Sequence, residues 1–494
     1  MAKITTIIDI GSNSMRMVVF KKTSHFAFHL INETKSKVKI SENSYQNNGL
    51  LQEIPMMRAF NAMESFLNIA KNLKSRKILC VATSALRDAP NKSVFLQKVK
   101  NELGIDIKVI DGEKEAYYGA VGANNLLKTD SFTTLDIGGG STELALVINK
   151  NITKTISLDI GTVRLKELFF DKNDLAGAKE YIDKQLSTLT LEYKKIGMLV
   201  GLGGTARALA RAIIQNTDHP FDVLHGFTYQ VKPALSLFES ILKASTNEKL
   251  SSLGVRSDRY DTIKVGTFIF KTILEFLEIK QVVTSGVGVR EGVYLTDILR
   301  TTHHKFPSNF SVSVKSLLDR FTDDSKQTAY LGNNISKIFD VLSPLHNLDN
   351  KYKSYLVISA KLQQIGISLN YYKNTEHSAN FILNGLNYGF THEDRILIAT
   401  IIKYSTKELP SEKNIKEFKN LLPDIKIIEW LSYIHSLNNL LNSEFLRHSY
   451  EYDLSGNIFT IKSSKDHYLI QKSIEKLEKP ANFELNLNFN GVLY

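Results

Sequence analysis

Short apolar runs alternate with longer stretches of helical periodicity over the first 300 residues of this 494-residue chain. Apolar runs at 77–82 and 105–110 predict strands. Apolar positions three and four residues apart predict helices over 55–73 and 92–103. Strands that alternate with helices of this length indicate an α/β fold.

Two strand–turn–strand segments carry nearly the same turn. The first turns at Asp9-Ile10-Gly11-Ser12-Asn13-Ser14, and the second turns at Asp136-Ile137-Gly138-Gly139-Gly140-Ser141. A glycine turn between strands is by itself most often a plain hairpin. Its repetition about 127 residues later predicts a duplicated fold with a phosphate between the halves. Neither turn fits the Walker or dinucleotide-binding pattern, because the chain leaves each turn as a strand.

These turns offer groups that suit an anion with a cation beside it. Glycine lets backbone N–H groups approach a ligand, and hydroxyls add donors. The predicted phosphate-binding residues are Gly11, Ser12, Asn13, Ser14, Gly138, Gly139, Gly140 and Ser141. Asp136 and Glu143 can hold a hydrated Mg²⁺ ion that bridges to phosphate oxygens, and Asp9 has the matching place in the first turn. We therefore expect Mg²⁺ as the cofactor.

Glu115 is the acid that we expect to be catalytic. It lies in the first turn of a helix that begins near 113, directly after a strand end. Ligands of open α/β sheets usually bind at strand ends. Backbone N–H groups at a helix start favour a carboxylate and should keep Glu115 ionised. An ordinary helix-start glutamate is the alternative on local sequence alone.

Residues 131–300 repeat the strand and helix plan and add a third glycine-rich turn at 201–207. This turn leads into a helix, so Gly203, Gly204 and Thr205 are candidates for binding a second phosphate or part of a nucleotide. After a linker at 301–308, the chain from 309 onward has few glycines and long helical stripes. Strand signals return there only at 458–461 and 483–489, which indicates a separate, mostly helical domain.

Composition narrows the class of protein. Apolar residues make up 43% of the chain, no apolar run is long enough to span a membrane, and no signal peptide is evident, so we expect a cytoplasmic protein. Cys80, the single cysteine, lies in a strand and suits a core position better than a nucleophilic one. The net charge is +11; residues 301–494 hold 22 basic and 20 acidic residues, which leaves +9 on residues 1–300. That excess fits an anionic ligand or a plain basic surface, and no motif specific for nucleic acid is present.

Five motifs occur in this order: Asp-Ile-Gly-Ser-Asn-Ser, Gly-Glu-Lys-Glu-Ala, Asp-Ile-Gly-Gly-Gly-Ser-Thr-Glu-Leu, Gly-Leu-Gly-Gly-Thr and Ser-Gly-Val-Gly-Val-Arg-Glu-Gly. As a set they resemble the exopolyphosphatase/guanosine pentaphosphate phosphohydrolase (Ppx/GppA) family over about residues 4–300. The resemblance implies two actin-like (RNase H-like, ASKHA) α/β domains at 1–125 and 126–300 with a central cleft. The tail at 309–494 resembles the helical, HD-like third domain of the family's longer members.

The resemblance also implies an activity. It implies Mg²⁺-dependent, processive release of terminal phosphate from inorganic polyphosphate, or of the 5′ γ-phosphate of pppGpp to give ppGpp. Glu115 matches the family's catalytic glutamate and Arg87 its arginine after the strand end, while Lys114 replaces an acid of the family motif. Arg16 and Arg259 fall where related members keep substrate-facing basic residues.

Two departures keep alternatives open. Gln363 and Gln364 stand where active HD domains carry a His-Asp pair, so we expect no HD phosphohydrolase chemistry and a role in dimerisation or substrate reach instead. A homodimer is expected. The alternatives are a kinase-like phosphotransferase of the acetate or sugar kinase type, and a polyphosphate or alarmone sensor without turnover.

Overall fold

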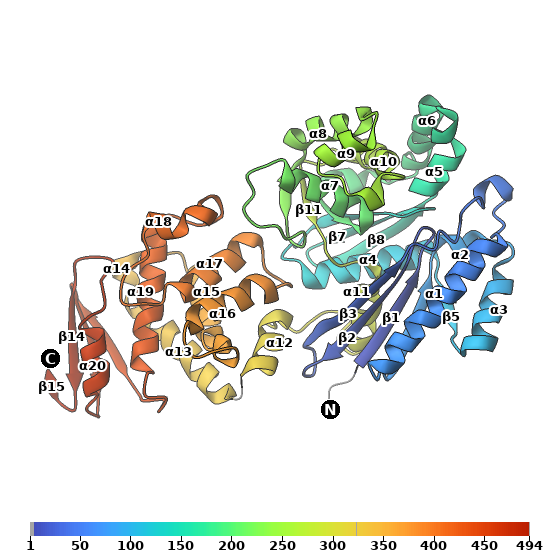
Figure 1. The fold of residues 1–494 in the computed structure, drawn as a ribbon. Helices are drawn as coiled ribbons and strands as arrows, with labels where there is room; N and C mark the ends of the chain where they lie inside the picture. The colour runs from blue at the N-terminus through green and yellow to red at the C-terminus, as the bar shows by residue number, and fades with distance from the viewer. Residues whose placement is uncertain (1–3, 323, 494) are drawn as a thin grey trace. The chain divides into compact units, whose positions relative to one another are not determined.

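The computed structural model describes residues 4–322 and 324–493 of the chain (Figure 1). The chain separates into two compact units, Met1–Phe310 and Ser311–Tyr494. The first unit contains both Asp-Ile-Gly turns. None of the helices in the described ranges is long and apolar enough to cross a membrane.

The first sheet of this unit has the strand order β3-β2-β1-β4-β5. Its strands are β1 (Ile4–Ile10), β2 (Met15–Lys22), β3 (Phe28–Ser36), β4 (Lys77–Ala82) and β5 (Ile107–Val109). The pairs β1–β2 and β2–β3 are antiparallel, whereas β1–β4 and β4–β5 are parallel. Cys80 on β4 is buried in the core beneath this sheet.

The second sheet repeats this plan in the order β10-β11-β9-β6-β7-β8. Its strands are β6 (Phe132–Ile137), β7 (Thr142–Ile148), β8 (Asn151–Leu158), β9 (Met198–Leu202), β10 (Thr228–Gln230) and β11 (Gln281–Thr284). The run β8-β7-β6-β9-β11 has the same sequence of antiparallel and parallel pairs as β3-β2-β1-β4-β5. The repeated turn motif therefore reflects a repeated sheet, to which β10 adds an antiparallel edge.

Helices cover both sheets because their apolar stripes face the strands. On the first sheet, α1 (Glu53–Asn72) buries Ala59, Met63 and Phe66, and α3 (Lys92–Leu103) buries Phe95 and Val99. The second sheet packs against α5 (Thr162–Leu168), α6 (Leu175–Leu186), α7 (Gly203–Gln215), α8 (Val231–Lys243), α9 (Asn247–Ser252) and α10 (Ile263–Phe276).

Helix α4 (Gly112–Leu126) joins the two halves of the unit. Its residues Ala120 and Ala123 belong to a core cluster with β6, β7, β9 and β11, so α4 packs on the second sheet. Helix α11 (Val289–Ile298) lies against α4, and the contact depends on two glycines. A Cβ atom at Gly122 would lie 2.9 Å from the carbonyl oxygen of Gly288, and one at Gly292 would overlap the carbonyl oxygen of Tyr118.

The second unit is mostly helical and ends in a small sheet. Its helices are α12 (Val312–Phe321), α13 (Ser325–Val341), α14 (Ser343–His346), α15 (Lys351–Leu362), α16 (Asn374–Gly385), α17 (His392–Lys403), α18 (Glu412–Ile415), α19 (Ile425–Leu441) and α20 (Tyr468–Ile474). Its sheet has the order β12-β13-β14-β15, with β12 (Glu451–Ser455), β13 (Ile458–Ser463), β14 (Glu484–Phe489) and β15 (Val492–Leu493). The strands predicted at 458–461 and 483–489 are confirmed as β13 and β14.

Several predicted boundaries are wrong by a few residues. The strand predicted at 105–110 spans only Ile107–Val109, and the helix predicted over 55–73 spans Glu53–Asn72. The helix predicted to follow the third glycine-rich turn at 201–207, α7, begins inside that turn, at Gly203. The linker is partly anchored, because the Tyr117 hydroxyl lies 2.7 Å from His304 Nδ1.

Candidate active site

The two Asp-Ile-Gly turns close with the same hydrogen bond. The Gly11 amide donates to the Ser14 carbonyl at 3.2 Å, and the Gly138 amide donates to the Ser141 carbonyl at 2.9 Å. Both glycine amides hold their own turns together, so the predicted part of Gly11 and Gly138 in phosphate binding stays a prediction. The amides of the residues inside each turn take no part in these closing bonds.

The turns face each other so closely that a side chain would not fit. A Cβ atom at Gly139 would lie 2.7 Å from Ser12 Cβ in the opposite turn. A Cβ atom at Gly140 would overlap the Tyr45 hydroxyl and lie 2.8 Å from Ser84 Oγ. The Ser12 and Ser84 hydroxyls are themselves hydrogen-bonded at 3.0 Å. These glycines are therefore needed for the close approach of the two halves.

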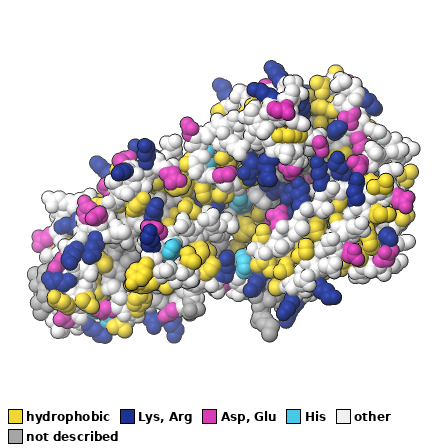
Figure 2. All heavy atoms as spheres, viewed as in Figure 1, with side chains coloured by type: hydrophobic (Ala, Val, Ile, Leu, Met, Phe, Trp, Pro, Cys, Tyr) yellow, Lys and Arg dark blue, Asp and Glu magenta, His cyan; other side chains and the backbone are white. Residues whose placement is uncertain are grey.

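A pocket opens where the turns meet, and it collects almost every residue that the sequence singled out. The predicted residues that line it are Asp9, Gly11, Ser12, Asn13, Ser14, Arg16, Glu115, Asp136, Gly138, Gly139, Ser141, Glu143, Gly203, Gly204, Thr205 and Arg259. Arg87 and Gly140 do not line it, but Arg87 donates from Nη2 to Ser141 Oγ at 3.3 Å. Figure 2 shows Lys and Arg side chains gathered around the hollow between the two sheets of the first unit. The functional roles of these residues stay predictions.

Glu115 is held in place from two directions. The Asp111 side chain caps α4 by accepting the Lys114 amide at 2.6 Å, which fixes the first turn of the helix. Arg87, from α2 (Ser84–Asp88) after β4, donates from Nη1 to Glu115 Oε2 at 3.0 Å. The Lys114 ammonium lies over the ring of Tyr117, 4.8 Å from its centroid.

Burial sets the protonation of Glu115. The residue is only 9% exposed, and this loss of hydration raises its pKa well above the ordinary value; Glu143 adds to the rise and Arg87 opposes it. We expect the helix start to keep Glu115 ionised, whereas burial acts in the opposite direction on its pKa. A helix terminus contributes about 0.3–1 kcal/mol, whereas full burial of a carboxyl shifts its pKa by several units.

Three further carboxylates carry raised pKa values. Burial raises the pKa of Asp9 to about 6 and that of Glu143 to about 7, and the neighbouring Asp136 adds to both. Burial also raises the pKa of Asp136 itself. Ser157 Oγ donates to Glu143 Oε1 at 2.8 Å and orients that carboxylate.

This donor set fits the expected cation. All three groups offer oxygen, they crowd negative charge into a buried place, and Mg²⁺ prefers such hard ligands. Among the described residues, one group of three acidic or histidine side chains has all its donor atoms within 4.8 Å of one another, and that group does not lie in this pocket. The carboxylates of this pocket therefore suit a hydrated cation reached partly through its waters.

Four arginines line the pocket, and only two of them, Arg16 and Arg259, are predicted from the sequence. Arg290 and Arg16 both donate to Glu33 Oε1, at 3.0 and 3.2 Å. Arg207 donates to the Gly286 carbonyl at 3.0 Å, and burial together with the nearby guanidinium groups lowers its pKa to about 10. The signal for the two missed residues was available, since Arg290 lies in the Ser-Gly-Val-Gly-Val-Arg-Glu-Gly motif and Arg207 is the last residue of the third glycine-rich turn.

The third glycine turn supports the second Asp-Ile-Gly turn. Gly203 has a φ of +70°, and a Cβ atom there would overlap Asp136 Oδ1. A Cβ atom at Gly204 would lie 2.5 Å from Arg259 Nη1. The turn thus lies against a predicted metal ligand on one side and a predicted substrate arginine on the other.

Arg164 was missed because its contacts are distant in sequence. Its Nε donates to the Gly140 carbonyl at 2.8 Å, and its Nη2 pairs with Asp88 Oδ2 at 2.9 Å. The guanidinium also stacks over the Tyr45 ring, 4.9 Å from the centroid. Arg164 therefore fixes the second turn from behind, where no motif pointed to it.

In the second unit, the residues that replace the HD pair have structural contacts. The Gln363 carbonyl accepts from Ser378 Oγ at 2.8 Å and from Asn374 Nδ2 at 3.0 Å. These contacts join the end of α15 to the first turns of α16. The absence of HD phosphohydrolase chemistry stays a prediction.

Two repeated α/β halves whose paired Asp-Ile-Gly turns face one pocket define a phosphate-handling protein of the actin-like fold class. The family model of the Ppx/GppA phosphatase family matches residues 18–301, and the model of its domain III matches residues 311–477. The chain belongs to the Ppx/GppA phosphatase family, which confirms the resemblance seen in the motifs. This membership places the chain among phosphate hydrolases.

Three known proteins illustrate the relationship. A guanosine-5'-triphosphate,3'-diphosphate pyrophosphatase of Photobacterium profundum is 26% identical over 415 residues, 82% of this chain and 80% of the relative. The crystal structure of an Aquifex aeolicus Ppx/GppA family member is 27% identical with a TM-score of 0.52, over 61% of this chain and 100% of that one. An exopolyphosphatase structure from Cytophaga hutchinsonii shares the fold at 24% identity and a TM-score of 0.55, over 60% of this chain and 98% of that one.

Proposed function

We propose that the chain releases the terminal phosphate of inorganic polyphosphate, or the 5′ γ-phosphate of pppGpp to give ppGpp, with Glu115 as the general base. The observation that carries the proposal is the 3.0 Å contact of Arg87 with Glu115 beside a pocket lined by both Asp-Ile-Gly turns. The Photobacterium relative, at 26% identity, is named as a guanosine-5'-triphosphate,3'-diphosphate pyrophosphatase, which supports the second of these substrates.

Hydrolysis of a phosphoanhydride needs a water held in line and stabilisation of the charge on the transferring phosphoryl group. Glu115 accepts a proton from that water as it attacks phosphorus. Burial serves this role, because a carboxylate with a raised pKa binds a proton more strongly and is a stronger base. Arg87 orients the carboxylate through its hydrogen bond, and its positive charge favours the ionised form of Glu115 by opposing the rise in its pKa.

The phosphate is bound by groups of both turns. Amides of Ser12, Asn13 and Gly139, which line the pocket and which the closing bonds of the turns do not use, donate to its oxygens. A divalent cation held by Asp9, Asp136 and Glu143 would supply positive charge that offsets the phosphate oxygens.

The pocket wall suits a polyanion. Its arginines, Arg16, Arg207, Arg259 and Arg290, give it four positive charges. Such a wall can hold the inner phosphates of a chain while the terminal one is cleaved, so we include processive release from polyphosphate in the proposal.

The test replaces Glu115 with glutamine, which keeps the shape and removes the base. We expect turnover to fall by on the order of a hundredfold or more, with a smaller effect on substrate binding. Glu113→Gln is the matched control, because Glu113 lies in the same helical turn but is exposed. Phosphate release is measured in parallel on long-chain polyphosphate and on pppGpp, and the ratio of kcat/KM for the two identifies the preferred substrate. Near-normal release by Glu115→Gln from both substrates would refute the assignment.

The same preparations separate the alternatives. Formation of ATP from ADP and polyphosphate, without phosphate release to water, would favour a kinase-like phosphotransferase. Tight binding of either ligand in Mg²⁺ without phosphate release would favour a sensor. We expect neither result. The expected homodimer is tested separately by light scattering of the full chain.

A further inference from the structure

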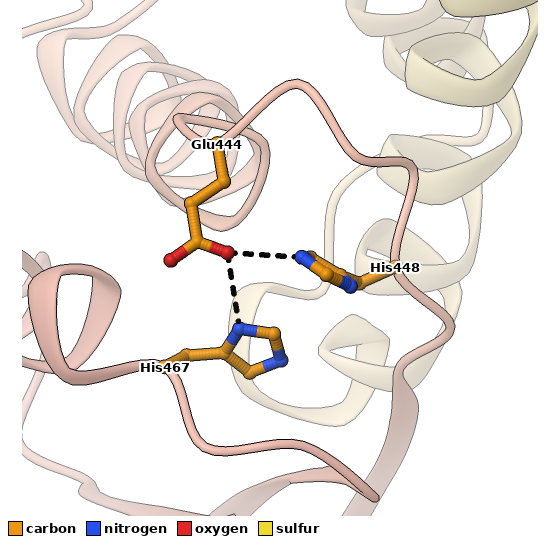
Figure 3. Close-up of side chains that lie close together, drawn as sticks. All are labelled: Glu444, His448 and His467. Carbon is orange, nitrogen blue, oxygen red and sulfur yellow. Dashed lines mark hydrogen bonds and ion pairs between the residues drawn. The ribbon is translucent and has the colours of Figure 1, made fainter.

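A cluster of two imidazoles and one carboxylate lies in the second unit, outside the pocket described above (Figure 3). Glu444 and His448 belong to the loop between α19 and β12, and His467 directly precedes α20. Glu444 Oε2 lies 2.9 Å from His448 Nε2 and 3.3 Å from His467 Nδ1. Figure 3 shows both rings directing a nitrogen at this one oxygen. In the described residues 4–322 and 324–493, this is the one group of three or more such side chains whose donor atoms all lie within 4.8 Å of one another.

The surroundings of the cluster hold the donors in position. His467 is fully enclosed, with 1% of its side chain exposed, while His448 is 7% and Glu444 29% exposed. His467 Nε2 lies 2.9 Å from Ser463 Oγ, which leaves Nδ1 to face Glu444. The rings of Tyr450 and Phe489 pack against His467 at centroid distances of 5.6 and 5.1 Å. A hydrogen bond to the far nitrogen and an apolar wall are the features that orient histidine ligands in metal sites.

The distances are also those of a coordination sphere. Zn²⁺ binds histidine nitrogen and carboxylate oxygen at about 2.0–2.2 Å in a tetrahedron, which separates neighbouring donor atoms by about 3.4 Å. The two separations from Glu444 Oε2, 2.9 and 3.3 Å, differ from this by about 0.5 Å or less, and the two histidine nitrogens lie within 4.8 Å of each other. A cation among the three atoms would replace the two protons that the imidazoles otherwise donate to Glu444, so small side-chain shifts suffice to admit it.

We propose that Glu444, His448 and His467 bind one divalent transition-metal ion, of which Zn²⁺ is the best match, at a site separate from the phosphate pocket. Two nitrogen donors and one oxygen donor suit Zn²⁺ and its neighbours in the first transition row, whereas Mg²⁺ prefers an all-oxygen set. The three protein ligands leave a fourth position for water.

The ion would join parts of the second unit that are separate in sequence. It would connect the loop that follows α19 with the segment between β13 and α20. Because the folded protein brings these donors together, metal binding stabilises the folded state of this unit. The proposal does not depend on the reaction proposed for the first unit.

The experiment uses the full chain after treatment with a chelator. Zn²⁺ is titrated calorimetrically in excess Mg²⁺, which competes for the carboxylates of the phosphate pocket, and Co²⁺ is added separately as a spectroscopic probe. The visible absorption of Co²⁺ rises when the hydrated ion enters a four-coordinate site. No thiolate contributes to this signal, because the single cysteine of the chain, Cys80, is buried in the first unit.

We expect one Zn²⁺ per chain, a Co²⁺ absorption band, and a melting temperature that rises with Zn²⁺. His448→Gln and Glu444→Gln should each weaken Zn²⁺ binding at least tenfold and abolish the band. These positions are chosen because His467 is fully buried, and melting curves in chelator verify that both variants fold. His303→Gln, which changes an exposed histidine, should bind Zn²⁺ like the wild type. The proposal is overturned if the wild type takes up no stoichiometric Zn²⁺ in Mg²⁺, or if the two ligand variants bind Zn²⁺ as the wild type does; the cluster is then only a hydrogen-bonded contact.

Discussion

Replacing Arg87 with glutamine tests whether this arginine sets the charge of the proposed base. Its guanidinium contacts Glu115 Oε2 at 3.0 Å, Ser141 Oγ at 3.3 Å and the Ile110 carbonyl at 3.3 Å. The Arg87 and Glu115 side chains are 21% and 11% exposed, so solvent screens their interaction only in part. Glutamine keeps a polar group at this position but removes the charge.

The structure gives the direction and the size of the effect. Burial raises the pKa of Glu115 and Arg87 holds it down, so removal of the cation must raise it further. A neighbouring arginine lowers the pKa of a carboxyl group by about 1–3 units. The acid limb of the kcat profile should therefore move up by about 1–3 pH units in Arg87→Gln. Loss of a charged donor near the transferring phosphate should also lower the plateau of kcat by about 10²–10³-fold.

The assay is phosphate release from the preferred substrate between pH 5 and 9.5 in saturating Mg²⁺. Arg300→Gln is the matched control, because Arg300 follows α11 with 73% of its side chain exposed, and its profile should not move. An acid limb that stays in place in Arg87→Gln, or moves to lower pH, would refute the view that Arg87 controls the protonation of the base.

Two other changes probe the turns and the buried carboxylates. Gly139→Ala puts a Cβ atom 2.7 Å from Ser12 Cβ, so thermal unfolding should show a free energy of unfolding lower by about 1–3 kcal/mol, and phosphate release should be lost. Gly197→Ala is the control, because the nearest atom to its Cβ is 3.7 Å away, and it should change neither the stability nor the phosphate release. Burial raises the pKa of Glu143 from 4.5 to about 7. Between about pH 4.5 and 7 the folded chain therefore keeps a proton that the unfolded chain releases, and the free energy of unfolding falls as the pH rises through this range. In chelator, Glu143→Gln should melt higher than the wild type at pH 8 and equally at pH 4.5, and an equal difference at both values would contradict this reasoning.

The sequence predicted the parts of the site that local chemistry encodes. A turn that needs glycine, an acid at the end of a strand and a helix start are visible within a few residues, so both Asp-Ile-Gly turns and Glu115 could be found. The pairing of Arg164 with the Gly140 carbonyl joins residues 24 apart, and that of Arg207 with the Gly286 carbonyl joins residues 79 apart. Contacts of this kind depend on how the elements pack, and no spacing rule reveals them.

The burial of side chains is the other property that could not be predicted from the sequence. The position of Glu115 in a helix start suggested a stabilised anion, but the pKa depends on the atoms that exclude water around it. The same limit applies to the cluster of Glu444, His448 and His467. Its ligand spacing matches no common metal motif, and only the return of the chain before α20 brings His467 to the other two residues.

The contact between Arg87 and Glu115 also has a consequence for how the pocket is assembled. Arg87 follows β4 of the first sheet, whereas Glu115 belongs to α4, which packs on the second sheet. The proposed base and its orienting cation therefore belong to elements that pack on different sheets, and the two turns that meet at Gly139 and Ser12 come from different halves of the duplicated fold. A displacement of one half by about 1 Å would lengthen these contacts together, and proximity effects are lost over such distances. Activity should thus depend on the fit between the halves as strongly as on the catalytic side chains.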